Sequence, residues 1–217
     1  YLFTAAACCQ AIVLHPGHEP NESFSDHPPD TVVGRWGTNA TFAVIGPSWI
    51  ITTRHQNSHP PCLTIDGKTY NVIYDVNNWQ GGPSGYADIR IMKLTCPDGN
   101  PARLTDWLPL YTDTDEIDQP VTIAGYGKAT DATLTSATGE ICGYTWDNSS
   151  NTTLRWCTNH IDSTLRGATD AIIADFDTPG QTRFEGTIAL YDSGGPWLIK
   201  QNGTWKLAGL SRGVTRH

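Results

Sequence analysis

The sequence predicts an all-β protein, on two observations. Short runs rich in β-branched and aromatic residues recur along the 217-residue chain, and Gly, Pro, Asn or Asp separates each run from the next. No long segment keeps the apolar period of a helix. The runs that we expect as strands are residues 31–36, 40–45, 49–53, 69–76, 89–94, 121–126, 153–160, 186–190, 197–200 and 204–210. Short strands with turn signals between them are typical of a β-barrel or sandwich.

The chain divides into two β-rich halves, residues 31–104 and 120–217. Residues 97–119 between them are poor in apolar runs, and we interpret 105–119 as the linker. The linker carries Asp113, Asp115, Glu116 and Asp118, which resembles a calcium loop. Ile117 stands where a further ligand is needed and no Gly follows, so a solvated acidic surface is the better interpretation.

The charge balance excludes two classes of partner. Lys and Arg number 14 against 22 Asp and Glu, for a net charge of -8. Nucleic acid or an anionic membrane surface would favour a basic stripe instead. No stretch approaches the roughly 20 apolar residues of a membrane span.

The N-terminal residues 1–11 are apolar and small, with Cys9 and Ala11 placed as at a cleavage site. We interpret them as the remnant of a signal peptide, which predicts a secreted or extracytoplasmic protein; a buried strand or helix is the alternative. Residues 12–30 would then be a leader. His15 and His18 flank Pro16 and Gly17, which prevent the helical turn needed for a shared metal, so no metal site is predicted.

Four of the six cysteines lie in the two halves, at Cys62, Cys96, Cys142 and Cys157. An even number in an exported chain suggests disulfide bonds. No CxxC spacing occurs among them, which disfavours a zinc site. Of the three possible pairings we favour Cys62–Cys96 and Cys142–Cys157, because each lies within one half.

Three motifs carry chemistry in the order His, Asp, Ser. His55 lies near the end of WIITTRHQ (residues 49–56), Asp88 lies near the start of ADIRIMKL (87–94), and Ser193 lies in YDSGGPW (191–197). A serine hydroxyl becomes a nucleophile when a histidine takes its proton and a buried carboxylate holds that histidine. Singly, each residue has a plainer explanation as a strand end or a turn. Their order and spacing together favour a nucleophilic site.

Residues 49–55, 87–94, 124–127 and 192–196 resemble motifs of the chymotrypsin/trypsin family of serine peptidases. The resemblance implies two antiparallel six-stranded β-barrels with the catalytic cleft between them, the second barrel incomplete at the C-terminus. It implies His55 as base, Asp88 as its orienting carboxylate and Ser193 as nucleophile. The backbone N–H groups of Tyr191 and Ser193 would form the oxyanion hole.

The same resemblance assigns substrate binding to Thr187 and to the segment Leu210, Ser211, Arg212 and Gly213. Thr187 carries no carboxylate, so a preference for Lys or Arg is not supported. Arg212 would favour an acidic side chain if it faced the pocket. We expect a monomer that acts on protein or peptide substrates without a cofactor.

Several positions depart from the family pattern. Tyr191 replaces a glycine of the oxyanion hole, while Arg54 and Gln56 flank His55 in place of Ala and Cys. A Cβ at Tyr191 disfavours the required turn. The family also continues past the position of His217, and we expect this chain to be a fragment at both ends.

In the family, the acid before the nucleophile pairs with a newly freed N-terminal ammonium. Cleavage after Ala11 would expose Ile12 for such a pairing with Asp192. Leu14 and His15 replace the usual two glycines and no Lys or Arg precedes Ile12, so local hydrogen bonds to Asp192 are the simpler expectation.

Two other functions compete with a peptidase. A catalytically silent homologue that binds extracellular partners is favoured by Tyr191 and Arg54, and disfavoured by the complete His–Asp–Ser set. An α/β-hydrolase esterase would need Gly two residues before the nucleophile and alternating helices and strands. Tyr191 and the all-β pattern disfavour it.

Overall fold

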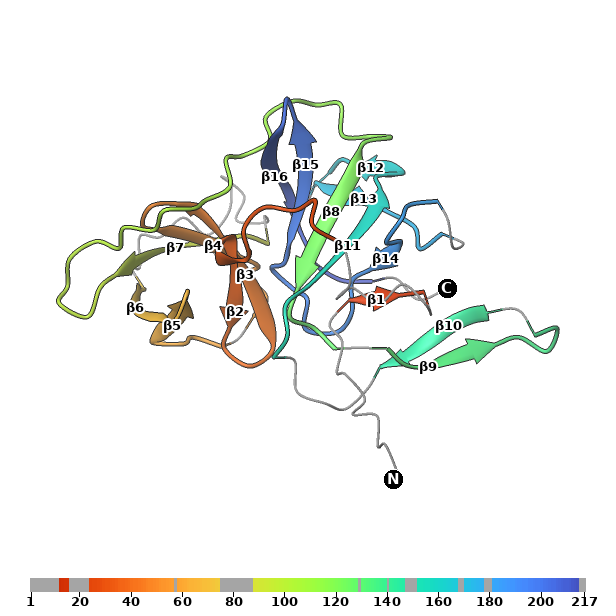
Figure 1. Ribbon diagram of the computed structural model, residues 1–217, viewed down its shortest axis with the longest axis horizontal. Coiled ribbons are helices and arrows are strands. Elements are labelled where there is room, and N and C mark those ends of the chain that lie inside the picture. The colour runs from red at the N-terminus through yellow and green to blue at the C-terminus, as the bar shows by residue number, and fades with distance from the viewer. Residues whose placement is uncertain are drawn as a thin grey trace, which may run out of the picture.

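A computed structural model describes residues 12–15, 24–56, 58–74, 88–128, 130–139, 141–146, 152–167, 170–177 and 181–214. These residues confirm the all-β prediction: they form strands and loops, with one short 3₁₀ turn, η1 (Asp30–Val32). Figure 1 shows two β-sheet halves side by side, joined by a long crossing segment. Within these ranges, no helix has the length and apolar character to cross a membrane.

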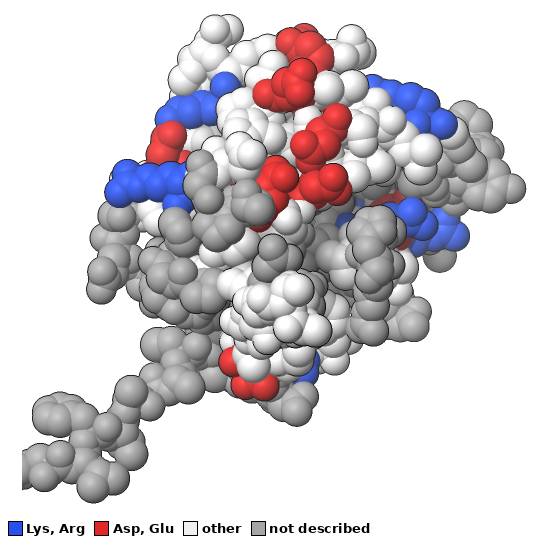
Figure 2. Space-filling model, turned by 90° about the vertical axis from the view of Figure 1, so that its right-hand side faces the viewer, with Lys and Arg blue, Asp and Glu red and all other residues white. Residues whose placement is uncertain are grey.

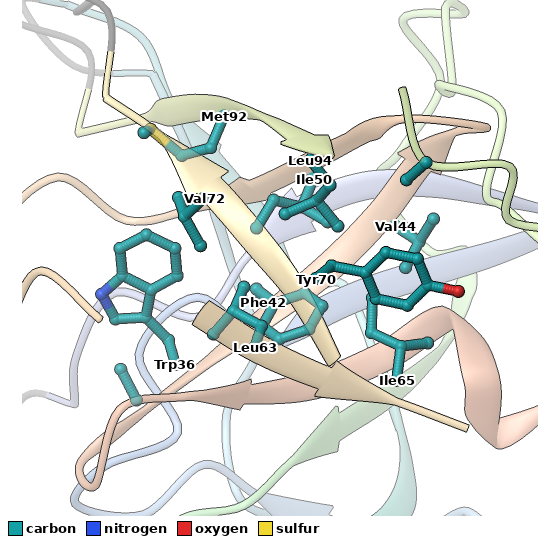
Figure 3. Close-up of a cluster of buried hydrophobic side chains, with 12 residues drawn as sticks. Trp36, Phe42, Val44, Ile50, Leu63, Ile65, Tyr70, Val72, Met92 and Leu94 are labelled. Carbon is teal, nitrogen blue, oxygen red and sulfur yellow. The ribbon is translucent and has the colours of Figure 1, made fainter. Parts of the chain in front are cut away.

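The N-terminal half is one antiparallel sheet of six strands in the order β2-β3-β4-β7-β6-β5. Its strands are β2 (Val33–Trp36), β3 (Ala40–Gly46), β4 (Trp49–Thr52), β5 (Cys62–Ile65), β6 (Lys68–Ile73) and β7 (Arg90–Thr95). The edge strands β2 and β5 approach each other, so the sheet curves into a nearly closed barrel. Inward-facing side chains fill it, among them Trp36, Phe42, Ile50, Met92 and Leu94 (Figure 3). Alternation explains β5, where Leu63 and Ile65 are buried and their neighbours exposed.

The C-terminal half is built on a four-stranded antiparallel sheet in the order β11-β8-β15-β16. These strands are β8 (Pro120–Gly125), β11 (Arg155–His160), β15 (Pro196–Gln201) and β16 (Thr204–Leu210). Two further pairs lie against this half: β12 (Ser163–Leu165) with β13 (Ala171–Ile173), and β1 (Val13–Leu14) with β14 (Gly186–Thr187). The hairpin of β9 (Thr130–Thr135) and β10 (Ile141–Trp146) projects away from the sheets in Figure 1.

A shared apolar cluster holds the two halves together. It contains Ala43 and Ile51 from the first half and Ala124, Leu198 and Leu207 from the second, all buried. The predicted linker crosses here: the N–H of Leu108 donates to the carbonyl of Val44, and the N–H of Tyr111 donates to the carbonyl of Leu207. The halves therefore meet along β3 and β4 on one side and β8, β15 and β16 on the other.

Residues 12–15, which the sequence assigns to a leader, are packed into the C-terminal half. Ile12 is fully buried, and Val13 and Leu14 pair with Thr187 and Gly186. The predicted signal remnant, residues 1–11, lies outside the described residues.

The predicted disulfides are wrong, because Cys62, Cys96 and Cys157 are free thiols. Cys62 lies opposite Asn71 on β6, and Asn71 lies opposite Thr95 on its other side. Cys62 and the end of β7 are therefore two strand spacings apart, roughly 9–10 Å, beyond the reach of a disulfide. Cys157 is fully buried in β11, whereas Cys142 belongs to the separate β9–β10 hairpin.

Candidate active site

His55 and Asp88 meet because β4 and β7 are antiparallel partners. Thr52, the last residue of β4, pairs with Arg90, the first residue of β7. The chain after Thr52 therefore runs beside the chain before Arg90, and the N–H of Arg54 donates to the carbonyl of Asp88 at 3.3 Å. Sheet register alone brings these two distant residues together.

The Asp88 carboxylate holds His55 at two points. One oxygen, Oδ1, accepts the backbone N–H of His55 at 2.9 Å, and the other, Oδ2, lies 2.6 Å from Nδ1 of the ring. The Asp88 side chain is 16% exposed and that of His55 is 41% exposed. The carboxylate therefore fixes both the backbone and the imidazole plane, and it favours the tautomer with the proton on Nδ1.

Ser193 lies in the loop between β14 and β15, at the junction of the two halves. Its carbonyl accepts the N–H of Thr41 from β3 at 2.9 Å, which ties the loop to the N-terminal half. The next residue, Gly194, has φ +84, and a Cβ there would stand 2.2 Å from the carbonyl oxygen of Thr41 and from Oγ1 of Thr52. Glycine is therefore required for the loop to approach β3 and β4 this closely.

The three side chains form a continuous hydrogen-bonded chain. The Ser193 hydroxyl oxygen lies 2.9 Å from Nε2 of His55, while Nδ1 of the same ring faces Asp88. With the proton on Nδ1, the lone pair of Nε2 can accept the Ser193 proton. Nε2 has a second neighbour that the sequence does not reveal: the amide nitrogen of Gln56 lies 2.8 Å away.

The nucleophile loop presents two backbone N–H groups beside Ser193. Tyr191 adopts φ +77, so the left-handed turn forms despite its Cβ. Within the described ranges, the backbone N–H groups of Tyr191 and Ser193 donate to no acceptor. The N–H groups of Asp192, Gly194 and Gly195, in contrast, all donate to backbone carbonyls. The Tyr191 ring lies under the Lys128 ammonium, 5.8 Å from the ring centroid.

Asp192 is fully buried beneath this loop and accepts three backbone N–H groups. Gly127 donates to Oδ1 at 2.6 Å, Ala189 donates to Oδ2 at 2.7 Å, and the N–H of Ile12 is the third donor. Burial raises the pKa of Asp192 to about 7, against the opposing effect of these donors and of the Arg155 charge. The buried carboxyl links the N-terminal segment to the loop that carries Ser193.

The predicted substrate-binding residues fall into three positions. Thr187 lies in β14, paired with Val13. Leu210 ends β16, and Ser211 is buried beside the nucleophile loop, where its N–H donates to the Gly195 carbonyl at 2.8 Å. Arg212 turns toward the His55–Asp88 pair, with its Nε 3.5 Å from Oδ2 of Asp88, and Gly213 follows it as exposed chain.

No cluster of three or more His, Cys, Asp or Glu side chains that could hold a metal ion occurs in the described part of the chain.

No protein-family model and no curated protein sequence matches this chain. Among solved structures it is similar to the crystal structure of Rv3671c protease in its inactive form. The two share 16% sequence identity with a TM-score of 0.46, over 82% of this chain and 74% of the other. A likeness at this level carries no information about chemistry, which rests on the chain's own residues.

Proposed function

We propose that this chain is a serine endopeptidase that hydrolyses peptide bonds through an acyl-enzyme intermediate. The observation that carries the proposal is the hydrogen-bonded chain from Asp88 through His55 to Ser193, with ring contacts of 2.6 and 2.9 Å. Export of the protein is part of the proposal and is based on residues 1–11 alone.

In the acylation half, Ser193 Oγ bonds to the peptide carbonyl carbon as His55 Nε2 takes its proton. Asp88 stabilises the imidazolium through Nδ1. The N–H groups of Tyr191 and Ser193 would donate to the oxygen that becomes negative. His55 then returns the proton to the departing amine nitrogen, the C–N bond breaks, and the acyl group remains on Ser193.

In the deacylation half, water replaces the amine. His55 takes a proton from water as its oxygen bonds to the acyl carbon, and the same N–H groups receive the oxyanion. The C–Oγ bond breaks, His55 returns the proton to Ser193, and the acid product leaves. One base with one carboxylate partner thus serves both halves.

A silent homologue that binds partners without turnover is the second candidate, and two contacts favour it. The Gln56 amide shares His55 Nε2 with Ser193, and the Arg212 guanidinium approaches the Asp88 oxygen that faces His55. Both contacts weaken a relay in the resting protein. The two candidates differ in whether Ser193 is an activated nucleophile.

A fluorophosphonate probe separates them, because it labels serine only where a base activates it. We expect labelling of the wild-type protein, loss of labelling in Ser193→Ala, and unchanged labelling in Ser136→Ala, a serine of the β9–β10 hairpin turn. Cleavage of a casein or peptide library should follow the same pattern. Wild-type-like cleavage by purified Ser193→Ala protein would rule out the peptidase proposal.

The contact of Ile12 with Asp192 supports an N-terminal activation step in this proposal. The fold holds Ile12 fully buried, with its N–H on the buried carboxyl behind the nucleophile loop. A chain cleaved before Ile12 would place an ammonium at the same point. The pairing would tie a proteolytic event to the conformation of the Tyr191–Ser193 loop.

A further inference from the structure

Arg212 has a fixed backbone and an exposed side chain. The residue before it, Ser211, is 1% exposed and is held on three sides. Its N–H donates to the Gly195 carbonyl, its carbonyl accepts the Gly194 N–H, and its hydroxyl accepts the Trp197 indole N–H at 3.0 Å. The Arg212 side chain is 64% exposed. It therefore projects into solvent from a rigid point beside the nucleophile loop.

The guanidinium contacts Asp88 loosely. Its Nε lies 3.5 Å from Oδ2, the oxygen that faces the His55 ring at 2.6 Å. Asp88 already accepts two bonds from His55, so Arg212 is its most distant and most solvated partner. Among the described residues, Asp88 is also the carboxylate that Arg212 contacts, and the contact uses Nε rather than a two-pronged fork. A loose, exposed ion pair of this kind is easily exchanged.

Basic side chains flank each member of the His55–Asp88–Ser193 chain. Arg54 is the exposed neighbour of His55, and its carbonyl accepts a bond from Arg90, two residues after Asp88. Lys128 lies over Tyr191 beside the nucleophile. This gathering stands out in a protein of net charge -8.

In the part of the chain that the structure describes, the two acids next to these residues are already bonded or buried. Asp88 is bonded to His55, and Asp192 is fully buried. Figure 2 shows a group of acidic side chains on the face that corresponds to the right-hand side of Figure 1. Arg54, Lys128 and Arg212 thus place several positive charges beside the described part of the site, although the protein as a whole is acidic.

We propose that Arg212 receives an acidic side chain of the peptide substrate and gives up its loose contact with Asp88 in doing so. The proposal rests on the peptidase function above and names its substrate class. A free carboxylate can engage the guanidinium through two parallel N–H bonds, which the Nε contact with Asp88 does not use. Thr187 carries no charge, so Arg212 is the residue among those predicted to bind substrate that can recognise a charged side chain.

A purely structural role for Arg212 predicts a different pattern. If the guanidinium served only to hold Asp88 in place, its loss would slow the cleavage of acidic and neutral peptides by the same factor. Recognition of an acid predicts instead a change in the ratio between matched peptides. The measurement is therefore a ratio rather than a rate.

The test uses peptide pairs that differ by Glu or Gln at one position, with that position varied over the four residues before the scissile bond. We expect at least one pair for which wild-type kcat/KM is tenfold or more higher with Glu. Arg212→Gln should bring this ratio to within twofold of one, and Arg212→Lys should retain part of it. Arg166→Gln, which removes an exposed Arg paired with Glu116 and Asp170, is the matched control and should keep the wild-type ratio.

A wild-type ratio near one at every position would overturn the proposal, and so would a ratio that survives Arg212→Gln. Fluorescence anisotropy measures the binding of the same intact peptides to Ser193→Ala protein. This second measurement separates a failure of recognition by Arg212 from a failure of the peptidase function. Cleavage without a Glu preference would reject the recognition by Arg212 alone. A Glu preference in binding that Arg212→Gln abolishes, without cleavage by wild-type protein, would reject the peptidase function and keep the carboxylate receptor.

Discussion

The amide nitrogen of Gln56 lies 2.8 Å from Nε2 of His55, and the hydroxyl oxygen of Ser193 lies 2.9 Å from the same nitrogen. A neutral imidazole with its proton on Nδ1 has one lone pair at Nε2, so two donors share one acceptor. Gln56 is 8% exposed, and burial keeps its side chain beside the ring. The amide therefore competes with the nucleophile for the base.

Removal of this competitor should increase reactivity. We expect Gln56→Leu, which keeps the approximate volume and removes the donor, to raise kcat/KM and the rate of fluorophosphonate labelling by roughly three- to tenfold, about 1 kcal/mol. Gln201→Leu changes the same residue type at the end of β15 and should leave both rates at the wild-type value. Slower labelling of Gln56→Leu, with its melting temperature retained, would show that the amide supports the ring rather than competes.

The Asp88 carboxylate accepts from both the backbone and the ring of His55, and an amide cannot accept at both points. We expect Asp88→Asn to reduce turnover on the order of ten-thousandfold, since the ring loses its tautomer and its counter-charge. Asp98→Asn removes an exposed carboxylate of a turn and should have no effect on turnover. Retained activity in a folded Asp88→Asn protein would remove Asp88 from the mechanism.

Periodicity explains why much of the fold was predictable. Apolar, β-branched runs such as those of β3, β4 and β15 must be buried on a sheet, and each was predicted within two residues of its observed bounds. The juxtaposition of His55 and Asp88 likewise follows from two strands that pair at Thr52 and Arg90. The motif order predicted this meeting without knowledge of the register.

Other features carry no signal in the sequence. The β9 strand of the projecting hairpin is exposed along nearly its whole length, so it lacks the alternation that reveals a half-buried strand. The distance between Cys62 and Cys96 depends on β6 lying between β5 and β7. The spacing of the cysteines along the chain does not predict this order of strands. The directions of the Gln56 and Arg212 side chains depend on the packing of both halves, and sequence reasoning assigned neither of them its contact.

Tyr191 holds a backbone conformation that most residues avoid, at φ +77. This conformation costs roughly 1–2 kcal/mol for a residue with a Cβ, and the Lys128 ammonium over its ring returns about 0.5–1 kcal/mol. We therefore expect Tyr191→Gly to change the free energy of unfolding by no more than about 1.5 kcal/mol, because the loss of the strain and the loss of the ring contact partly cancel.

A β-branched residue at the same position tests the turn itself. Tyr191→Val loses the ring contact and adds the strain of a β-branched side chain at positive φ, so it should destabilise the protein by about 1–2 kcal/mol and lower kcat/KM at least tenfold. Urea unfolding and peptide cleavage measure the two effects. Equal behaviour of the Gly and Val variants would mean that the turn does not control the oxyanion site.

Asp192 makes stability depend on pH, in a direction that its burial fixes. Its pKa in the folded protein is raised from 3.8 to about 7. Between these values the folded state holds a proton that the unfolded state has released. The protonated Asp192 therefore adds its full contribution to the free energy of unfolding below about pH 4, and this contribution is lost as the pH rises through about 7. Its size is roughly 1.4 kcal/mol for each unit by which the folded and unfolded pKa values differ. Urea unfolding of protein that still carries the residues before Ile12 should show this loss of stability between pH 4 and pH 7. Asp192→Asn should make the loss smaller.

A new N-terminus at Ile12 should reverse this behaviour. Its ammonium would lie beside the Asp192 carboxyl, where an opposite charge favours ionisation and lowers the pKa. Protein that begins at Ile12 should therefore keep its stability from pH 5 to pH 7.5. Its peptidase activity should exceed that of the longer chain by tenfold or more, and it should decline above about pH 8 as the ammonium loses its proton. An N-acetylated version that starts at Ile12 is the control, because it keeps the buried segment without the charge. Full activity in protein that starts at Gly17 would contradict the activation step, since Ile12 and its contact with Asp192 would then be dispensable.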